Sequence, residues 1–100
     1  MPAYMFIESR VIDPEKYRQY IAQVPAIIAQ HGGRFLVRGG KITPLSDAWK
    51  PERIIILEFP SEAHIQRWLS SPEYKNIAPL REAGAETRAA ILEGYNVTGS

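Results

Sequence analysis

Apolar and polar residues alternate along four short segments of the chain, as they do in strands with one buried face. From Ala3 to Ile12 the odd positions are nearly all apolar and the even positions are mixed. Segments 34–38 and 53–59 combine β-branched or aromatic residues with arginines, and a fourth segment covers about 86–95. The pattern therefore predicts four strands.

A longer segment between the first two strands has the three- and four-residue spacing of a helix. Apolar and aromatic residues from Tyr17 to His31 fall on one helix face, and Asp13 before Pro14 is a typical helix start. Pro25 lies inside this pattern and cannot donate a hydrogen bond to the carbonyl four residues earlier. Because the apolar face resumes in phase, we expect a kink there and not an end.

Two further helices are predicted between the third and fourth strands. Ser61 is the expected cap of the first, and Ser71 before Pro72 begins the second, which ends at Gly84. The aromatic residues on the predicted helix faces are expected in the core, where they pack against the sheet. They are Tyr17, Tyr20, Trp68 and Tyr74.

The stretch HGGRFLVRGG, residues 31–40, contains the end of the first predicted helix and the second predicted strand. Its first glycine pair stops a helix, because glycine takes the left-handed conformation without strain. The second pair is expected to form a turn or bulge. Between the pairs, strand alternation places Phe35 and Val37 on one side, and Arg34, Leu36 and Arg38 on the other.

The order strand, helix, strand, strand, helix, strand predicts a ferredoxin-like α+β sandwich with an antiparallel four-stranded sheet. The expected strand order is 4-1-3-2, with the helices on one face. Strands one and three are then central neighbours. The candidate catalytic residues described below would lie together only if these two strands ran parallel.

Length and composition add limits to this picture. The chain has 100 residues, a net charge of +1 and no cysteine, and its Lys and Arg residues are scattered. These features predict one domain over residues 1–95 with a flexible tail at 96–100, and argue against nucleic acid as a partner. No signal peptide or apolar stretch of membrane-spanning length is seen, so we expect a cytoplasmic protein with no membrane partner.

The alternation also sorts the strand residues into two faces. One face is apolar and is assigned to the helix side, with Ala3, Met5, Ile7, Val11, Phe35, Val37, Ile55, Leu57 and Phe59. The other mixes apolar residues with charges: Tyr4, Phe6, Glu8, Arg10, Leu36, Arg38, Ile54, Ile56 and Glu58. Such a face is too apolar for free solvent and too charged for a plain core. We therefore expect a homodimer in which two sheets pack face to face around a cavity.

Several motifs carry a resemblance to a known family. The run HGGRFLVRGG, the segment Glu58-Phe59-Pro60-Ser61 and the segment SPEY at 71–74, followed by Pro79-Leu80-Arg81, resemble the domain of unknown function 1330 family over about residues 3–95. The resemblance implies a dimeric α+β barrel. That superfamily includes cofactor-free monooxygenases, lactone isomerases, haem-degrading enzymes and plain ligand binders, and the family itself has no settled activity.

Three charged residues are the first candidates for chemistry. If strands one and three are parallel, Glu8 and Glu58 point into the same space, and two nearby carboxylates give one acid and one base. Arg38 on the next strand offsets their charge or binds a substrate carboxylate. The alternative is an internal ion cluster that fixes strand register or dimer pairing.

Three more residues are candidates for ligand binding. Tyr4 lies on the mixed face, and Trp49 lies in a proline-flanked loop, where it is either a lid or an anchor. His31 is a possible base, but its place in a last helical turn favours a cap on free carbonyls. The two histidines show no ligand spacing, so neither a metal nor a cofactor is expected.

The sequence thus predicts a protein that binds a small organic molecule, such as an organic acid, in a cavity between two sheets. An isomerase, lyase or monooxygenase reaction without a cofactor is one form of this hypothesis, and whether any reaction occurs stays open. The alternative is a non-enzymatic binding or structural homodimer in which the charges of the sheet only fix the interface.

Overall fold

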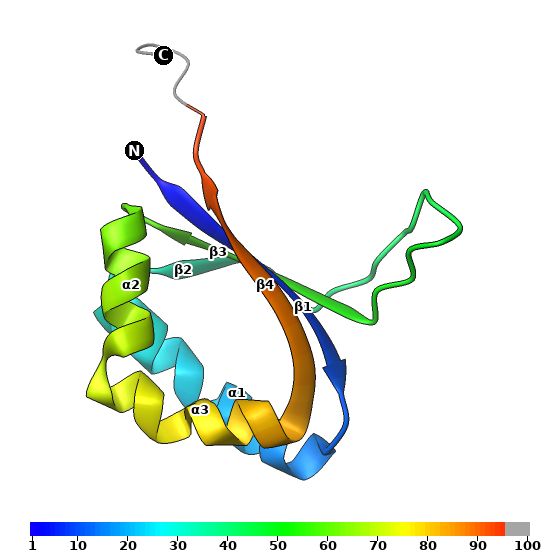
Figure 1. The fold of residues 1–100 in the computed structure, drawn as a ribbon, viewed down its shortest axis with the longest axis horizontal. Coiled ribbons are helices and arrows are strands. Elements are labelled where there is room, and N and C mark those ends of the chain that lie inside the picture. The colour runs from blue at the N-terminus through cyan, green and yellow to red at the C-terminus, as the bar shows by residue number, and fades with distance from the viewer. Residues whose placement is uncertain (96–100) are drawn as a thin grey trace.

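The computed structural model describes residues 1–95 and has the predicted βαββαβ order (Figure 1). The tail expected at 96–100 lies outside the described residues. The elements are β1 (Ala3–Val11), α1 (Pro14–Gln30), β2 (Arg34–Arg38), β3 (Arg53–Phe59), α2 (Glu62–Ser70), α3 (Pro72–Gly84) and β4 (Ala85–Glu93). The ferredoxin-like fold is therefore confirmed, with element bounds close to those expected.

The four strands form one sheet in the order β2-β3-β1-β4, as predicted. All neighbours are antiparallel, as the predicted antiparallel sheet requires, so the parallel arrangement of β1 and β3 on which the carboxylate argument was conditional does not occur. The connections explain these directions. The helical crossover through α1 makes β2 run in the same direction as β1, and β3 pairs antiparallel with β2, so β3 also runs antiparallel to β1.

Side-chain caps begin the helices where the sequence placed them. The Asp13 carboxylate accepts hydrogen bonds from the backbone N–H groups of Glu15 and Lys16, each at 3.2 Å. Ser61 and Ser71 accept in the same way at the starts of α2 and α3. Helix α1 continues through Pro25, as expected.

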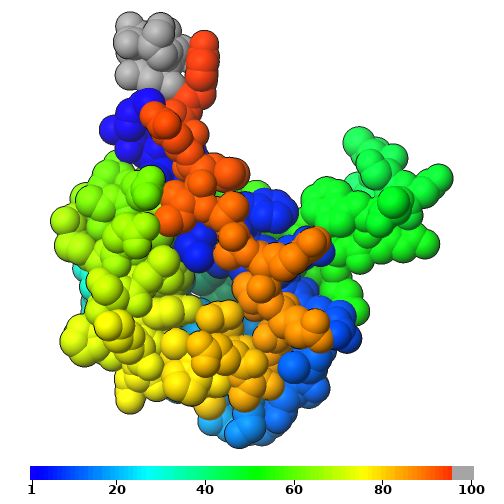
Figure 2. Space-filling view, in the orientation of Figure 1, coloured from blue at the N-terminus to red at the C-terminus, as the bar shows by residue number. Residues whose placement is uncertain are grey.

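The helices cover one face of the sheet and leave the other open (Figure 1). The core lies between the two layers, and its largest fully buried side chains are Phe59 and Leu57 from β3 and Ile65 and Trp68 from α2. The segment between β2 and β3 projects from this body (Figure 2). Within residues 1–95, no helix combines the length and the apolar character that crossing a membrane requires.

A bulge in β2 changes the faces that the sequence predicted. Phe35 pairs with Leu57, but Val37 pairs with Ile56 and Arg38 with Ile55, because the extra residue of the bulge shifts the alternation by one. Val37 therefore lies on the open face. Arg38 lies on the helix side, where it lines the space below α1. Both were assigned to the opposite faces, and both assignments were wrong for this reason.

Gly33 provides a test of the packing between α1, β2 and β3. A Cβ atom at this position would lie 2.5 Å from the Phe59 ring and 2.8 Å from the Ile28 side chain. Both side chains are buried, so Gly33→Ala is expected to lower the free energy of unfolding by about 1–3 kcal/mol in urea denaturation. Gly40→Ala is the control, because nothing lies within 4 Å of its added Cβ. Equal losses from the two variants would contradict this packing.

Candidate functional site

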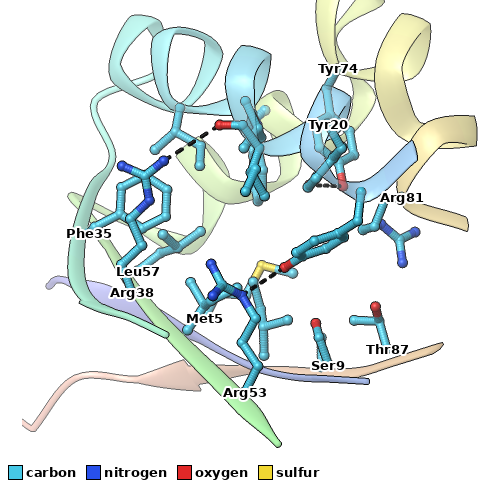
Figure 3. A pocket seen from close by; sticks show the side chains of 18 of the residues that line it. Met5, Ser9, Tyr20, Phe35, Arg38, Arg53, Leu57, Tyr74, Arg81 and Thr87 are labelled. Atoms are coloured by element: carbon cyan, nitrogen blue, oxygen red, sulfur yellow. Dashed lines mark hydrogen bonds between the residues drawn. The ribbon is translucent and has the colours of Figure 1, made fainter. Parts of the chain in front are cut away.

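A cavity of about 300 Å³ lies between the helices and the sheet of the single chain (Figure 3). All four strands and all three helices of the described fold contribute to its lining. Most of the wall is apolar or aromatic, with Met5, Leu57 and Phe35 from the sheet and tyrosine rings from α1 and α3. This cavity lies within a single chain, whereas the cavity predicted from the sequence lies between the sheets of two copies.

Three arginines line this apolar space. They are Arg38 on β2, Arg53 on β3 and Arg81 on α3. No aspartate or glutamate lines the cavity, and none of the ion pairs found within residues 1–95 involves these three guanidinium groups. Because arginine stays charged in proteins, the cavity carries positive charge that its own wall does not neutralise.

Local contacts hold two of the arginines in place. The Arg53 Nε donates to the Tyr17 hydroxyl at 3.0 Å, and its guanidinium lies 5.5 Å from the centre of the Tyr17 ring. The Arg38 guanidinium lies 4.7 Å from the centre of the Phe35 ring. Contacts of this kind orient a guanidinium without neutralising its charge.

A second contact of Arg38 depends on Pro25. Because proline has no N–H, the carbonyl of Ile21 lacks its helical donor. The Nη2 of Arg38 donates to this carbonyl at 3.5 Å (Figure 3). The carbonyl that Pro25 leaves without its helical donor therefore helps to hold an arginine of the sheet at the cavity.

The roof of the cavity carries two tyrosine hydroxyls. Those of Tyr20 and Tyr74 are 3.0 Å apart and share a hydrogen bond. Burial, together with the neighbouring Tyr74, raises the pKa of Tyr20 far above its usual value, so this hydroxyl stays protonated. The core prediction for Tyr17, Tyr20, Trp68 and Tyr74 is confirmed, and all four also line the cavity.

Three polar atoms in this wall are buried and have no hydrogen-bond partner within the described part of the chain. They are Trp68 Nε1, Arg81 Nε and Thr87 Oγ1. A buried polar group without a partner costs about 1–3 kcal/mol. Such groups are normally satisfied, so three of them among the residues of one cavity mark a part of the fold whose hydrogen bonding is incomplete within the described chain.

The two predicted catalytic carboxylates lie apart on the open face of the sheet. Glu8 is opposite Ile54 and Glu58 is opposite Tyr4, four residues away, which is about 13 Å along a strand. The expectation that they share one space was wrong, because it assumed parallel strands. Each carboxylate instead pairs with its own arginine, Glu8 with Arg88 at 2.9 Å and Glu58 with Arg34 at 2.6 Å.

Tyr4 joins the pair at Glu58. Its hydroxyl donates to the Glu58 carboxylate at 3.1 Å. The hydrogen bond from Arg34 is the main cause that lowers the pKa of Glu58, and the bond from Tyr4 lowers it further. The same hydrogen bond raises the pKa of the Tyr4 hydroxyl. Together, these residues form a paired ion cluster on the open face.

Trp49 and His31 lie outside the cavity wall. The Trp49 Nε1 donates to Glu8 at 3.4 Å, so the projecting loop contacts the open face of the sheet. The His31 Nδ1 lies 2.8 Å from the Ile27 carbonyl, which only accepts, so the ring donates to the end of α1. This contact supports the cap that the sequence favoured for His31.

Four residues of the cavity were not predicted from the sequence: Ser9, Arg53, Arg81 and Thr87. A signal was available for two of them. Ser9 shares its parity with Met5, Ile7 and Val11, and Arg53 shares its parity with Ile55 and Phe59, so both are polar residues on an apolar face. Within residues 1–95, no three histidine, aspartate or glutamate side chains gather as metal ligands do.

Comparison with solved structures finds the same fold in proteins of distant sequence. A protein of unknown function from Rhodopseudomonas palustris, RPA0582, has a TM-score of 0.76 at 19% identity, covering 95% of this chain and 83% of that one. A dabb family protein with a ferredoxin-like fold from Mesorhizobium loti has a TM-score of 0.69 at 12% identity, covering 95% and 98%.

A third structure belongs to a named enzyme. SnoaB, a cofactor-independent oxygenase from Streptomyces nogalater, has a TM-score of 0.65 at 15% identity, covering 99% of this chain and 98% of that one. At these identities the likeness is one of fold. No curated protein sequence matches the chain.

The family match is direct and covers nearly the whole chain. The model of the family named "Domain of unknown function (DUF1330)" matches residues 2–95. This range includes both glycine pairs of residues 31–40 and every element of the sheet. The chain therefore belongs to the DUF1330 family.

Proposed function

We propose that this protein binds a small organic acid with an apolar body in the cavity between its helices and its sheet. The observation that carries the proposal is the lining: three arginines and no carboxylate in a mostly apolar space of about 300 Å³. A guanidinium binds a carboxylate with charge-assisted hydrogen bonds, and the apolar wall accepts the rest of the molecule.

The enzymatic form of this proposal is a reaction of the bound acid without a cofactor. SnoaB, a cofactor-independent oxygenase, supports it by sharing the fold. The cavity wall supplies arginines that hold an anion and protonated tyrosines that donate hydrogen bonds. It supplies no carboxylate or histidine as a base, so binding is the primary function and Glu8 and Glu58 take no part in it.

We also propose that a second copy of this chain covers the open face of the sheet. Tyr4, Phe6, Ile54 and Ile56 are half-buried there, and Val37 and Leu92 are 40% and 49% exposed. A sheet face this apolar favours association. In such a dimer the ion pairs of Glu8 and Glu58 with their arginines help to fix the interface, which is the non-catalytic role considered for these charges. A cytoplasmic location, suggested by the lack of cysteine, completes this proposal.

Acid binding is tested with benzoate and its neutral isostere benzamide. Benzoate is expected to raise the melting temperature in proportion to the logarithm of its concentration, and benzamide far less, because only the acid engages the arginines. Arg38→Gln and Arg53→Gln are each expected to weaken benzoate binding about tenfold or more in calorimetry. Arg67→Gln on the exposed side of α2 is the matched control. Equal binding of acid and amide, or an equal loss in the control, would contradict the proposal.

The dimer is tested by sedimentation equilibrium at micromolar concentration. The unmodified protein is expected to sediment as a dimer. Ile56→Lys places a charge in the middle of the open face and is expected to give a folded monomer. Leu45→Lys is the control, since Leu45 is 96% exposed in the projecting loop. A monomeric unmodified protein would rule out the second copy.

The ion cluster predicts a pH dependence of stability. The pKa of Glu58 is lower in the folded chain than in the unfolded chain, so its contribution is present above the unfolded value and is lost as pH falls through the folded value. Thermal unfolding of Glu58→Gln is therefore expected to depend less on pH below about 4.5 than that of the unmodified protein. Glu82→Gln, an exposed change on α3, is the control. Identical pH profiles for all three proteins would show that the cluster contributes nothing.

A further inference from the structure

The cavity has polar groups at two separated places. Figure 3 shows Arg38 on one side, Arg81 and Thr87 on the other, and Arg53 between them. Arg38 belongs to β2 and Thr87 to β4, the two edges of the sheet. Three strand spacings separate these edges, about 14 Å, so one carboxylate does not reach both.

Strand register builds the second polar place. On the helix-facing side, Ser9 of β1 pairs with Arg53 of β3 on one flank and with Thr87 of β4 on the other. This polar row crosses three strands beside rows of apolar residues. Ser9 is 4% exposed, so the middle of the row is buried, and Arg53 and Thr87 on either side of it are half-buried.

Two groups at the Thr87 end of this row have no hydrogen-bond partner. Arg81 Nε and Thr87 Oγ1 are both buried and unpartnered within residues 1–95, and both belong to residues that line the cavity. An arginine nitrogen only donates, whereas a hydroxyl both donates and accepts. An acceptor oxygen is therefore the one kind of group that pairs with both.

We propose that the ligand carries a second acceptor oxygen, a carbonyl or a carboxylate, which binds Arg81 and Thr87 while its first carboxylate binds Arg38 and Arg53. This inference rests on the proposed acid binding and narrows the ligand class to keto acids and dicarboxylic acids with an apolar middle. An acid with one polar end leaves two buried donors unsatisfied, so it binds more weakly.

A matched pair of ligands tests the second contact. The 3- and 4-acetylbenzoates carry the carbonyl oxygen, and the 3- and 4-isopropylbenzoates have nearly the same shape without it. In calorimetry, at least one acetylbenzoate is expected to bind about fivefold tighter or more than its isopropyl counterpart, which is the factor that one hydrogen bond gives. A ratio of one for both pairs would overturn the inference.

Variants assign this preference to residues. Thr87→Val and Arg81→Met are each expected to lower the acetyl-to-isopropyl ratio, and Thr87→Ser is expected to keep it. Thr43→Val and Arg67→Met, in the projecting loop and on α2, are the controls. Because the ratio is measured within each variant, a loss of stability does not imitate the effect, and Thr87→Val keeps the shape of the side chain. An unchanged ratio in both cavity variants would overturn the assignment.

The outcomes separate this inference from the proposed function. If no benzoate derivative binds, acid binding itself fails. If the isopropylbenzoates bind through Arg38 and Arg53 but the acetyl oxygen adds nothing, acid binding stands and only the second contact fails.

Discussion

The antiparallel pairing of β1 with both of its neighbours is the constraint on which the rest of the structure depends. It places Ser9 between Arg53 and Thr87 on the side covered by helices, and Glu8 beside Arg88 on the open side. A shift of one residue in either pairing would exchange the faces of a whole strand. The cavity, its polar row and the open face all follow from this register.

The two faces of the sheet hold charge in different ways. On the open face, Glu8 and Glu58 are neutralised by arginines within the chain. On the helix side, Arg53 and Arg81 form no ion pair within residues 1–95, and both line a mostly apolar cavity that contains no carboxylate. A paired surface charge contributes little to stability, whereas an unpaired charge in a cavity attracts an oppositely charged group. This contrast is the reason that we propose acid binding under the helices and association on the open face.

The fold was predictable because each element carries its own local signal. Period-two strands, helix-starting caps at Asp13, Ser61 and Ser71, and the glycine pairs all lie where the structure uses them. The site was less predictable, because it depends on relations between elements. The bulge that turns Arg38 toward α1 breaks simple alternation, and strand direction decides that Glu8 and Glu58 do not meet.

The cavity itself has no signature in any one segment. It exists because the helices do not fill the space above the polar row, and this depends on packing between elements distant in sequence. What the sequence does show is Ser9 and Arg53 at positions where alternation calls for apolar residues. Polar residues at such positions are therefore the part of the site that can be found without a structure.

Pro25 connects the hydrogen bonding of α1 to the position of an arginine on β2. Without an N–H, position 25 leaves the Ile21 carbonyl with no helical donor, and the Arg38 guanidinium donates to it at 3.5 Å. A residue with an N–H there would supply the helical donor, and Arg38 would then share the carbonyl with it. Because both positions act on one carbonyl, we expect the costs of changing them to be coupled and not additive.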